Sequence, residues 1–275
     1  MVTLKKIKEG DIVGRISYKK DVLFNVVRII NDKTIILKGI TTRVEADAEI
    51  DDLEIISPKE VTERLRFFND ELYSRITKEE SNVKRFLGFN IGKRYRLNNS
   101  GRILHLDGDR KYSEKSLKYY RGLGLNAIVR NIAENRQAMV VKQLVERYQP
   151  DILVITGHDG MIKRKVGYQD IYNYRNSRHF VKTVQEARST KSSNELVIFA
   201  GACQSFYEAI ITAGANFASS PARILIDFVD PLVVAEKIAT TDAGRFVTIN
   251  DFEKELRDGQ RGVSGIGAMG KMKKM

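Results

Sequence analysis

The sequence predicts an α/β fold in which a parallel sheet lies between two layers of helices, preceded by a small β-rich domain. Short, wholly apolar runs alternate with helical stretches after residue 100, which is typical of parallel strands buried on both faces. Before residue 58, short β-branched runs are separated by turn residues instead. Of the 275 residues 42% are hydrophobic, enough to form the cores of one large and one small domain.

Residues 1–57 predict the small domain, an SH3-like β-barrel. Asn31-Asp32 and Gly39 supply turns between its short apolar runs. Residues 58–100 predict a helical linker, because apolar side chains recur there at helical spacing, and its last ten residues predict a loop. The strands expected in the small domain are 23–30, 34–38 and 42–46.

Residues 101–258 predict the α/β domain, in which strand-like and helical runs alternate. Residues 259–275 are rich in Gly and Lys and have little periodicity, which predicts a flexible tail or a loop that a partner orders. The expected strands are 103–106, 127–132, 152–156, 196–199 and 223–229, and the expected helices are 113–121, 135–148, 176–188, 204–213 and 232–238.

The cysteine and histidine content excludes several classes of protein. One cysteine allows no internal disulfide and no cysteine-based zinc cluster, and three histidines bind a metal only with carboxylate help. We therefore expect no metal and no cofactor. Because no apolar run reaches about 18 residues and the N-terminus has no apolar leader, we expect no membrane span and a reducing, cytoplasmic compartment.

The net charge favours anionic partners. The 47 Lys and Arg residues outnumber the 35 Asp and Glu residues, which gives a net charge of +12. The basic residues gather only in short clusters, such as Lys19-Lys20 and the run 163–165, and such clusters are typical of solvated faces. We therefore do not expect nucleic acid as a partner.

One cysteine and one histidine follow apolar runs of the predicted sheet. In open α/β sheets, function lies beyond the carboxyl ends of the strands. His158 follows the run 152–156, beside Gly157, and Cys203 follows the run 196–199. If the two strands are neighbours, both side chains emerge at one edge, where the imidazole can take the thiol proton and make the sulfur a nucleophile.

Two backbone features strengthen this hypothesis. Cys203 directly precedes a predicted helix, and a helix N-terminus lowers the pKa of a thiol and directs free N–H groups at it. The N–H groups of Gly160 and Cys203 are then the expected oxyanion hole for a tetrahedral intermediate. An ordinary structural role also fits, since a single cysteine after an apolar strand is typical of a buried core residue.

The spacing of the two residues resembles that of caspase-type cysteine peptidases, in which strand-His-Gly precedes strand-Ala-Cys by about fifty residues. The corresponding segments here are His158-Asp159-Gly160 and Gly201-Ala202-Cys203-Gln204. An Asp separates the His from the Gly, and Gly201 stands where caspases have Gln. The resemblance implies a caspase-like, three-layer α/β fold.

Longer segments carry a second resemblance. They are 10–15 (GDIVGR), 104–109 (LHLDGD), 150–159 (PDILVITGHD), 173–177 (NYRNS), 199–205 (FAGACQS) and 213–221 (AGANFASSP). Together they resemble the YabG sporulation-specific protease family over nearly the whole chain. The resemblance implies a peptidase of the mother-cell cytoplasm in spore-forming bacteria, associated with the spore coat. It also implies protein substrates, spore coat and related proteins, and Cys203 as nucleophile.

Three carboxylates lie at the ends of predicted strands: Asp107, Asp109 and Asp230. A peptidase needs a pocket for the residue before the scissile bond, and carboxylates there favour Lys or, by bidentate pairing, Arg. We therefore expect cleavage after basic residues, with Asp107 as first choice because it directly ends the first strand of the sheet. A turn-capping role fits the same residues.

Two other functions remain open from the residues. A different cysteine hydrolase on an α/β sheet has its cysteine in the same strand-to-helix turn, but that class usually has its histidine after the cysteine, whereas all histidines here precede Cys203. A basic, non-enzymatic scaffold binds acidic coat proteins or nucleic acid, and its binding falls steeply with salt.

Overall fold

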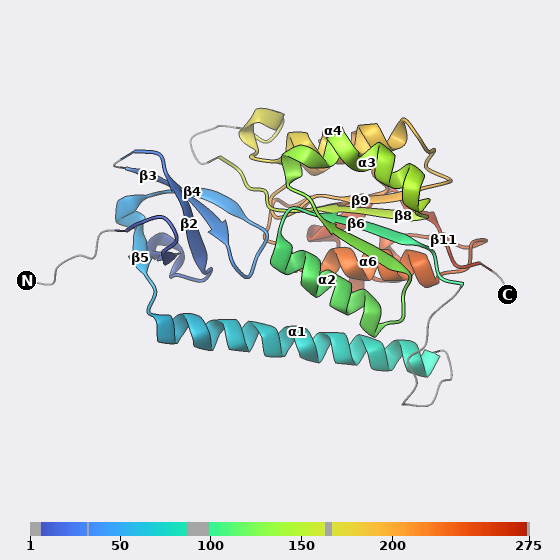
Figure 1. The fold of residues 1–275 in the computed structure, drawn as a ribbon, viewed down its shortest axis with the longest axis horizontal. Helices are drawn as coiled ribbons and strands as arrows, with labels where there is room; N and C mark the ends of the chain where they lie inside the picture. Colours follow the sequence, from blue (N-terminus) through green and yellow to red (C-terminus); the bar gives the residue numbers. More distant parts are fainter. Residues whose placement is uncertain (1–6, 32, 87–98, 163–166, 274–275) are drawn as a thin grey trace, which may run out of the picture.

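The chain folds into a small antiparallel sheet, a long helix and a larger α/β unit (Figure 1). The computed structural model describes residues 7–31, 33–86, 99–162 and 167–273. The basic run 163–165 and most of the loop expected at 91–100 lie outside the described residues. None of the helices in this part of the chain is long and apolar enough to cross a membrane.

The small sheet is antiparallel throughout. Its strands, in order across the sheet, are β4 (Glu45–Glu49), β3 (Thr34–Gly39), β2 (Phe24–Ile29), β1 (Ile12–Arg15) and β5 (Leu53–Ile55). Val13, Ile35 and Leu37 point into its core and are fully buried. Because β4 and β5 lie at the two ends of the order, the pairing describes an open sheet, and closure into a barrel stays a prediction.

A long helix, α1 (Pro58–Phe86), follows the small sheet directly. The hydroxyl of Ser57 accepts a hydrogen bond from the Glu60 amide, and proline in the first turn needs no N–H partner, so the sequence defines this start well. The helix contacts α2 (Arg110–Gly122) and runs along the α/β unit (Figure 1). It falls within the expected helical linker.

The larger unit is an α/β domain, as the sequence predicts. Its sheet runs, in order, β12 (Val263–Gly265), β10 (Phe217–Ser219), β9 (Val197–Ala200), β8 (Ile152–Thr156), β6 (Ile103–Asp107) and β7 (Ala127–Asn131). All neighbouring pairs are parallel except β10 with β12. The strand order reverses between β6 and β8, and ligand sites of open α/β sheets lie beyond the carboxyl ends of strands at such a point.

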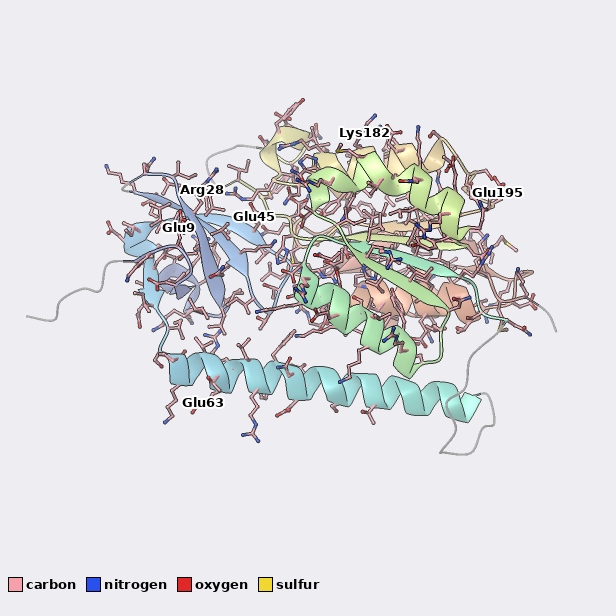
Figure 2. All side chains as sticks on the ribbon, in the orientation of Figure 1. Glu9, Arg28, Glu45, Glu63, Lys182 and Glu195 are labelled. Atoms are coloured by element: carbon pink, nitrogen blue, oxygen red, sulfur yellow. The ribbon has the colours of Figure 1, made fainter. Side chains whose placement is uncertain are left out.

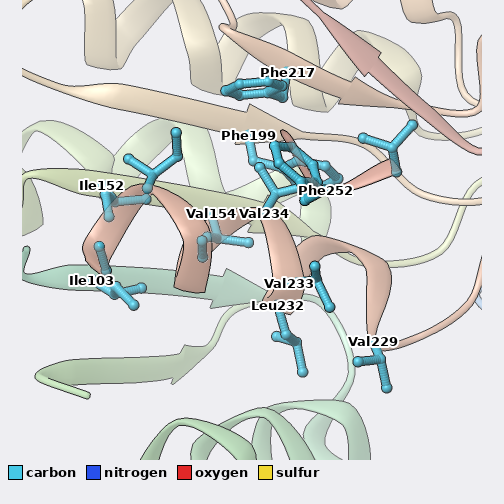
Figure 3. Close-up of a cluster of buried hydrophobic side chains, with 14 of the residues drawn as sticks. Ile103, Ile152, Val154, Phe199, Phe217, Val229, Leu232, Val233, Val234 and Phe252 are labelled. Carbon is cyan, nitrogen blue, oxygen red and sulfur yellow. The ribbon is translucent and has the colours of Figure 1, made fainter. Parts of the chain in front are cut away.

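Helices cover both faces of this sheet (Figure 1). One face carries α3 (Glu134–Tyr148), α4 (Ser177–Arg188) and α5 (Tyr207–Thr212), and the other carries α2 and α6 (Asp230–Thr240). Figure 3 shows Val234 of α6 near Phe199 and Val154 of the strands, and all three belong to one buried cluster. Burial on both faces explains why the parallel strands read as short, continuous apolar runs.

The strand expected at 223–229 is wrong, and the strand that follows β9 in the sheet is β10. Ser220 and Arg223 have φ angles of 61° and 57°, in the left-handed region that strands do not use. The apolar residues of this loop are buried in two different places, Ile226 against the small sheet and Phe228 in the core around α6. Burial of a loop, not strand pairing, accounts for their hydrophobicity.

The C-terminal segment is packed on the domain, so the expected flexible tail is wrong. β12 pairs with β10 at the sheet edge, and β13 (Ala268–Met269) pairs with β11 (Phe246–Val247). Gly265 lies so close to the Asn216 carbonyl oxygen that a Cβ atom would collide with it. Glycine here allows the two backbones to pack closely.

Short 3₁₀ helices connect the larger elements. They lie at Ile16–Tyr18, Ile50–Asp52, Ile171–Asn173, Ile249–Asp251, Glu253–Glu255 and Gly259–Arg261.

The packing of this segment is testable with a matched pair of substitutions. Val263 is fully buried in β12, whereas Ile266 is 64% exposed. We expect Val263→Ala to lower the free energy of unfolding by about 2 kcal/mol, because two buried methyl groups are lost. Ile266→Ala should change it by less than about 0.5 kcal/mol. Urea titration of both variants measures the difference, and equally small effects would mean that the segment does not pack as described.

Candidate active site

Three loops meet at the carboxyl edge of the larger sheet. Asp107 ends β6, His158 follows β8, and Cys203 follows β9. β8 pairs with both β6 and β9, so the strands that carry these residues adjoin. All three side chains are fully buried, because the small sheet lies against this end of the α/β unit (Figure 1).

Cys203 lies in a turn and not at a helix N-terminus. The helix expected at 204–213 begins only at Tyr207, so the predicted lowering of the thiol pKa by a helix is wrong. Sγ of Cys203 lies 3.9 Å from the Ile226 carbonyl oxygen, and burial raises the pKa of the thiol to about 11. The thiol is therefore neutral near pH 7 in this structure.

The turn that carries the thiol is tight and held by hydrogen bonds. Gln204 has a φ of 56°, a left-handed conformation that residues with a side chain rarely adopt. The Ala202 amide donates to the Ser205 hydroxyl, and the Gln204 amide donates to the Ser220 hydroxyl. These contacts fix the direction of the intervening Cys203 side chain.

His158 is a neutral imidazole with one free nitrogen. Its Nε2 lies 3.2 Å from the Gly39 carbonyl oxygen, a pairing that requires the proton on Nε2. Nδ1 is buried and has no hydrogen-bond partner among the described residues. Burial moves the pKa of His158 well below its ordinary value, and the positive charges of Lys38 and Arg43 lower it further. Nδ1 is therefore an unprotonated base.

Glu134 of α3 fixes the backbone on which His158 stands. Its Oε1 accepts a hydrogen bond of 2.7 Å from the His158 amide. The same carboxylate leaves no space for a Cβ atom at Gly157 or Gly108. Close approach of Glu134 thus explains the glycine before His158 and the glycine after Asp107.

Asp159 joins the histidine loop to the cysteine loop. Its Oδ2 accepts hydrogen bonds from the hydroxyls of Ser177 and Ser205, at 2.5 and 2.9 Å. Its Oδ1 accepts from the Gly160 amide at 2.8 Å, so that N–H is already engaged and the Asp159 amide donates to the Arg43 carbonyl oxygen instead, at 3.2 Å. Sequence analysis missed Asp159 because its partners lie far apart in the chain.

Cys203 and His158 share no hydrogen bond in the described part of the structure. Both instead face residues 39–43 of the small sheet: Nε2 of His158 lies against a carbonyl oxygen of this segment, and the backbone of Arg43 lies near enough to the Cys203 thiol to lower its pKa, against the larger effect of burial. The ring of Tyr112 lies 5.8 Å from that of His158, and Cys203 affects the pKa of Tyr112. The two residues therefore line one site, with a segment of the small sheet across it.

Asp107 is the centre of a buried polar network. Its Oδ2 accepts a hydrogen bond of 2.8 Å from the Thr156 hydroxyl and lies 2.7 Å from Nη2 of Arg43. The Thr156 hydroxyl also pairs with Nε2 of His105 at 2.7 Å. Burial raises the pKa of the Asp107 carboxyl, and the Arg43 guanidinium offsets part of that rise. Asp107 and Arg43 thus form an ion pair away from solvent.

Arg43 fills a slot that suits a guanidinium. Its guanidinium carbon lies 4.8 Å from the centre of the Tyr112 ring and 5.2 Å from that of Phe228. The slot thus has aromatic walls and a carboxylate, that of Asp107, at its end. Sequence analysis missed Arg43, since a polar turn of one domain gives no sign of a contact in another.

The other two candidate carboxylates have structural roles in this structure. Asp109 caps α2 and accepts hydrogen bonds from two backbone amides of its first turn. Asp230 begins α6 and accepts from two loop amides. Of the three, Asp107 is the one whose carboxylate pairs with the guanidinium in the slot.

The described residues contain no group of three or more His, Cys, Asp and Glu side chains arranged to hold a metal ion.

A cysteine and a histidine at the edge of an α/β sheet, beside a slot for one charged side chain, are typical of peptidases. The family model described as YabG peptidase U57 matches residues 8–275, and the chain belongs to this family. It is 35% identical over 277 residues to the "Sporulation-specific protease YabG" of Bacillus subtilis (strain 168), which covers 95% of this chain and 94% of the relative. No solved structure matches the chain.

The family membership confirms that the chain is a peptidase, as the sequence predicts, whereas the cysteine type stays a prediction. The chain is a protease of a sporulation-specific family. A non-peptidase hydrolase and a non-enzymatic scaffold are therefore set aside.

The burial of the thiol has a measurable consequence. Because the pKa of Cys203 is raised to about 11, the reactive thiolate is scarce below that pH. We expect its alkylation rate with iodoacetamide to rise about tenfold per pH unit from pH 6 to 9.5 without levelling off. Intact mass reports the reaction cleanly, since the chain has one cysteine. Glutathione, run in parallel, should level off near its own, lower pKa, and a plateau below pH 8 for the protein would contradict the assignment.

Proposed function

We propose that the protein is a cysteine endopeptidase that cleaves after basic residues, with Cys203 as nucleophile and His158 as base on a caspase-like α/β domain. The observation that carries the proposal is the slot beside Cys203, in which the Asp107 carboxylate already holds a guanidinium at 2.7 Å. A planar guanidinium pairs with a carboxylate and stacks on aromatic rings better than other side chains do. The residue bound there during cleavage is therefore Arg first and Lys second.

The geometry supports a dyad mechanism. Nδ1 of His158, unprotonated and without a partner, takes the proton from the Cys203 thiol as Sγ attacks the carbonyl carbon of the bound peptide. The protonated imidazole then gives this proton to the leaving amine, and a thioester remains on Cys203. Water, deprotonated by the same nitrogen, hydrolyses the thioester and restores the thiol.

The oxyanion of the tetrahedral intermediate needs N–H donors. We place the Asp159 amide there together with the Cys203 amide, because the Asp159 amide already donates to a carbonyl oxygen beside the thiol, at 3.2 Å. Gly160, the donor expected from the sequence, has its N–H on the Asp159 carboxylate. A switch of the Gly160 amide toward the substrate would require that bond to break.

The substrates that fit this proposal are spore coat and related proteins, cleaved in the mother cell. The relative from Bacillus subtilis is named a sporulation-specific protease. Its name supports a role in sporulation for this chain, and spore coat association is our inference from the family. Protein substrates account for the enzyme class without a nucleic-acid partner.

The dyad is tested by removing each member. We expect Cys203→Ala and His158→Ala to lower cleavage of casein or of a basic coat-protein extract at least about a thousandfold, because each removes an essential step of bond breaking. Mass spectrometry of the fragments measures cleavage and should show Arg or Lys at the new C-termini. Thermal melting checks that both variants are folded. Equal cleavage by the two variants and the wild type would remove these residues from the mechanism.

The slot is tested by a preference ratio. We expect Asp107→Asn to reduce the ratio of kcat/KM for an Arg peptide amide to that for its citrulline analogue about 10- to 100-fold, because a charge-assisted pair is lost. The ratio is used because a substitution that changes how easily peptides reach the active site affects both peptides equally, and that effect cancels. Asp109→Asn, a cap of α2, is the matched control and should leave the ratio within about twofold. An unchanged ratio in the Asp107 variant would place the specificity elsewhere.

A further inference from the structure

We propose that residues 39–45, the plug segment, close the active site of this protein as a substrate-like plug, with Arg43 in the slot, and hold the peptidase latent until the segment is displaced. This inference rests on the proposed function, because it interprets the slot as the binding site for a substrate Arg. The segment joins β3 to β4 of the small sheet and reaches into the edge of the larger sheet.

The backbone of the plug segment pairs with the histidine loop at one point. The Arg43 carbonyl oxygen accepts a hydrogen bond from the Asp159 amide at 3.2 Å, and the Glu45 amide donates to the Asp159 carbonyl oxygen at 2.7 Å. Val44 and Asp159 thus form an isolated parallel β-bridge. Backbone pairing of this kind, over a longer stretch, is a common mode of peptide recognition. It places an Arg carbonyl beside the Cys203 turn.

The plug segment also covers the two residues that cleavage needs. The Gly39 carbonyl oxygen pairs with Nε2 of His158, and the backbone of Arg43 lies near enough to the Cys203 thiol to affect its pKa. The Tyr112 hydroxyl donates to the Ile40 carbonyl oxygen at 3.3 Å. With these contacts in place, no second peptide reaches the thiol or the slot.

A second set of contacts holds the plug segment from outside the slot. Arg175 binds Asp47 at 2.7 Å and lies 3.7 Å from Glu45, and both acidic residues belong to β4. Figure 2 shows Glu45 at the boundary between the small sheet and the α/β unit. Arg175 is thus a latch that touches neither the thiol nor the Asp107 carboxylate in the described contacts, and it can be removed while the slot stays intact.

In the closed state the Arg43 side chain lacks hydrogen-bond partners, and this lowers the cost of releasing the plug segment. Nε, Nη1 and Nη2 of Arg43 are all buried without a hydrogen bond of good geometry among the described residues, although Nη2 lies 2.7 Å from the Asp107 carboxylate. A buried charge with unsatisfied donors is costly, so the plug is a weaker ligand than an ideal one. A substrate Arg of the same chemistry competes with it, and the observed kcat/KM is reduced by the fraction of molecules that are open.

The experiment compares Arg43→Gln and Arg175→Gln with the wild type and with Arg28→Gln, an exposed arginine of β2 that serves as the charge-matched control. Two rates are measured on each full-length protein: kcat/KM for a fluorogenic Arg peptide amide, and alkylation of Cys203 by iodoacetamide. We expect both rates to rise at least about tenfold in the Arg43 and Arg175 variants, because the open fraction increases. Arg28→Gln should stay within about twofold of the wild type.

The two readouts separate this inference from the proposed function. If the wild type cleaves the peptide through Cys203 but neither variant raises either rate, the plug is overturned and the peptidase stands. If no protein cleaves the peptide but alkylation accelerates in the variants, the plug stands and the proposed specificity fails. Should Arg43→Gln fail to fold, as a thermal melt would show, Arg175→Gln decides the question, because it leaves the buried pair in place.

Discussion

The buried ion pair of Arg43 and Asp107 links the small sheet to the α/β unit at the centre of the candidate site. It joins the turn after β3 to the end of β6, with both side chains out of solvent. Loss of one partner of such a pair costs about 3–5 kcal/mol, since the other charge remains buried. Thr156 and His105 extend the pair into the larger sheet, so the docking of the small sheet and the polarity of the site are parts of one network.

The small sheet, which this pair holds against the α/β unit, also affects the pKa values of the residues that it buries. Burial depresses the pKa of His158 and raises that of Cys203, so both are neutral and a thiolate–imidazolium pair is disfavoured. When solvent or a polar peptide replaces the cover, both pKa values return toward their ordinary ranges. Transfer of the thiol proton to the imidazole then becomes easier. Opening therefore affects reactivity as well as access.

The parts of the fold that the sequence predicts are those fixed by local pattern. β8 reads as a continuous apolar run because it is buried on both faces, and its end places His158 at the sheet edge. Cys203 follows the neighbouring strand in the same way, so both positions follow from strand periodicity and topology alone.

Other parts depend on contacts that no local pattern records. The loop at 223–229 is apolar because Ile226 and Phe228 are buried in two separate cores. Its sequence therefore looks like that of a buried strand. Gly265 in β12 is needed because the Asn216 carbonyl oxygen leaves no space for a Cβ atom, and the sequence alone does not show that contact. Arg43 is the clearest case, since its partner Asp107 lies in the other domain. Tertiary contact, not propensity, decided each of these positions.

A substrate must replace every contact of the plug segment, and this requirement defines what kind of chain can enter. Arg43 supplies a guanidinium to Asp107 and a carbonyl oxygen to the Asp159 amide, and the next residues add one β-bridge to Asp159. Arg43 makes these contacts from the turn between β3 and β4, whereas an arginine within a helix cannot, because its backbone groups are already paired. Under the proposed function, the site therefore selects a basic residue in an accessible loop or extended segment and rejects one within a helix. A substrate must also bind more tightly than the plug segment does. Because the plug segment is tethered to the protein, its local concentration at the slot is high, and a substrate has to outcompete it. Under the two proposals, latency and selectivity are results of one set of contacts.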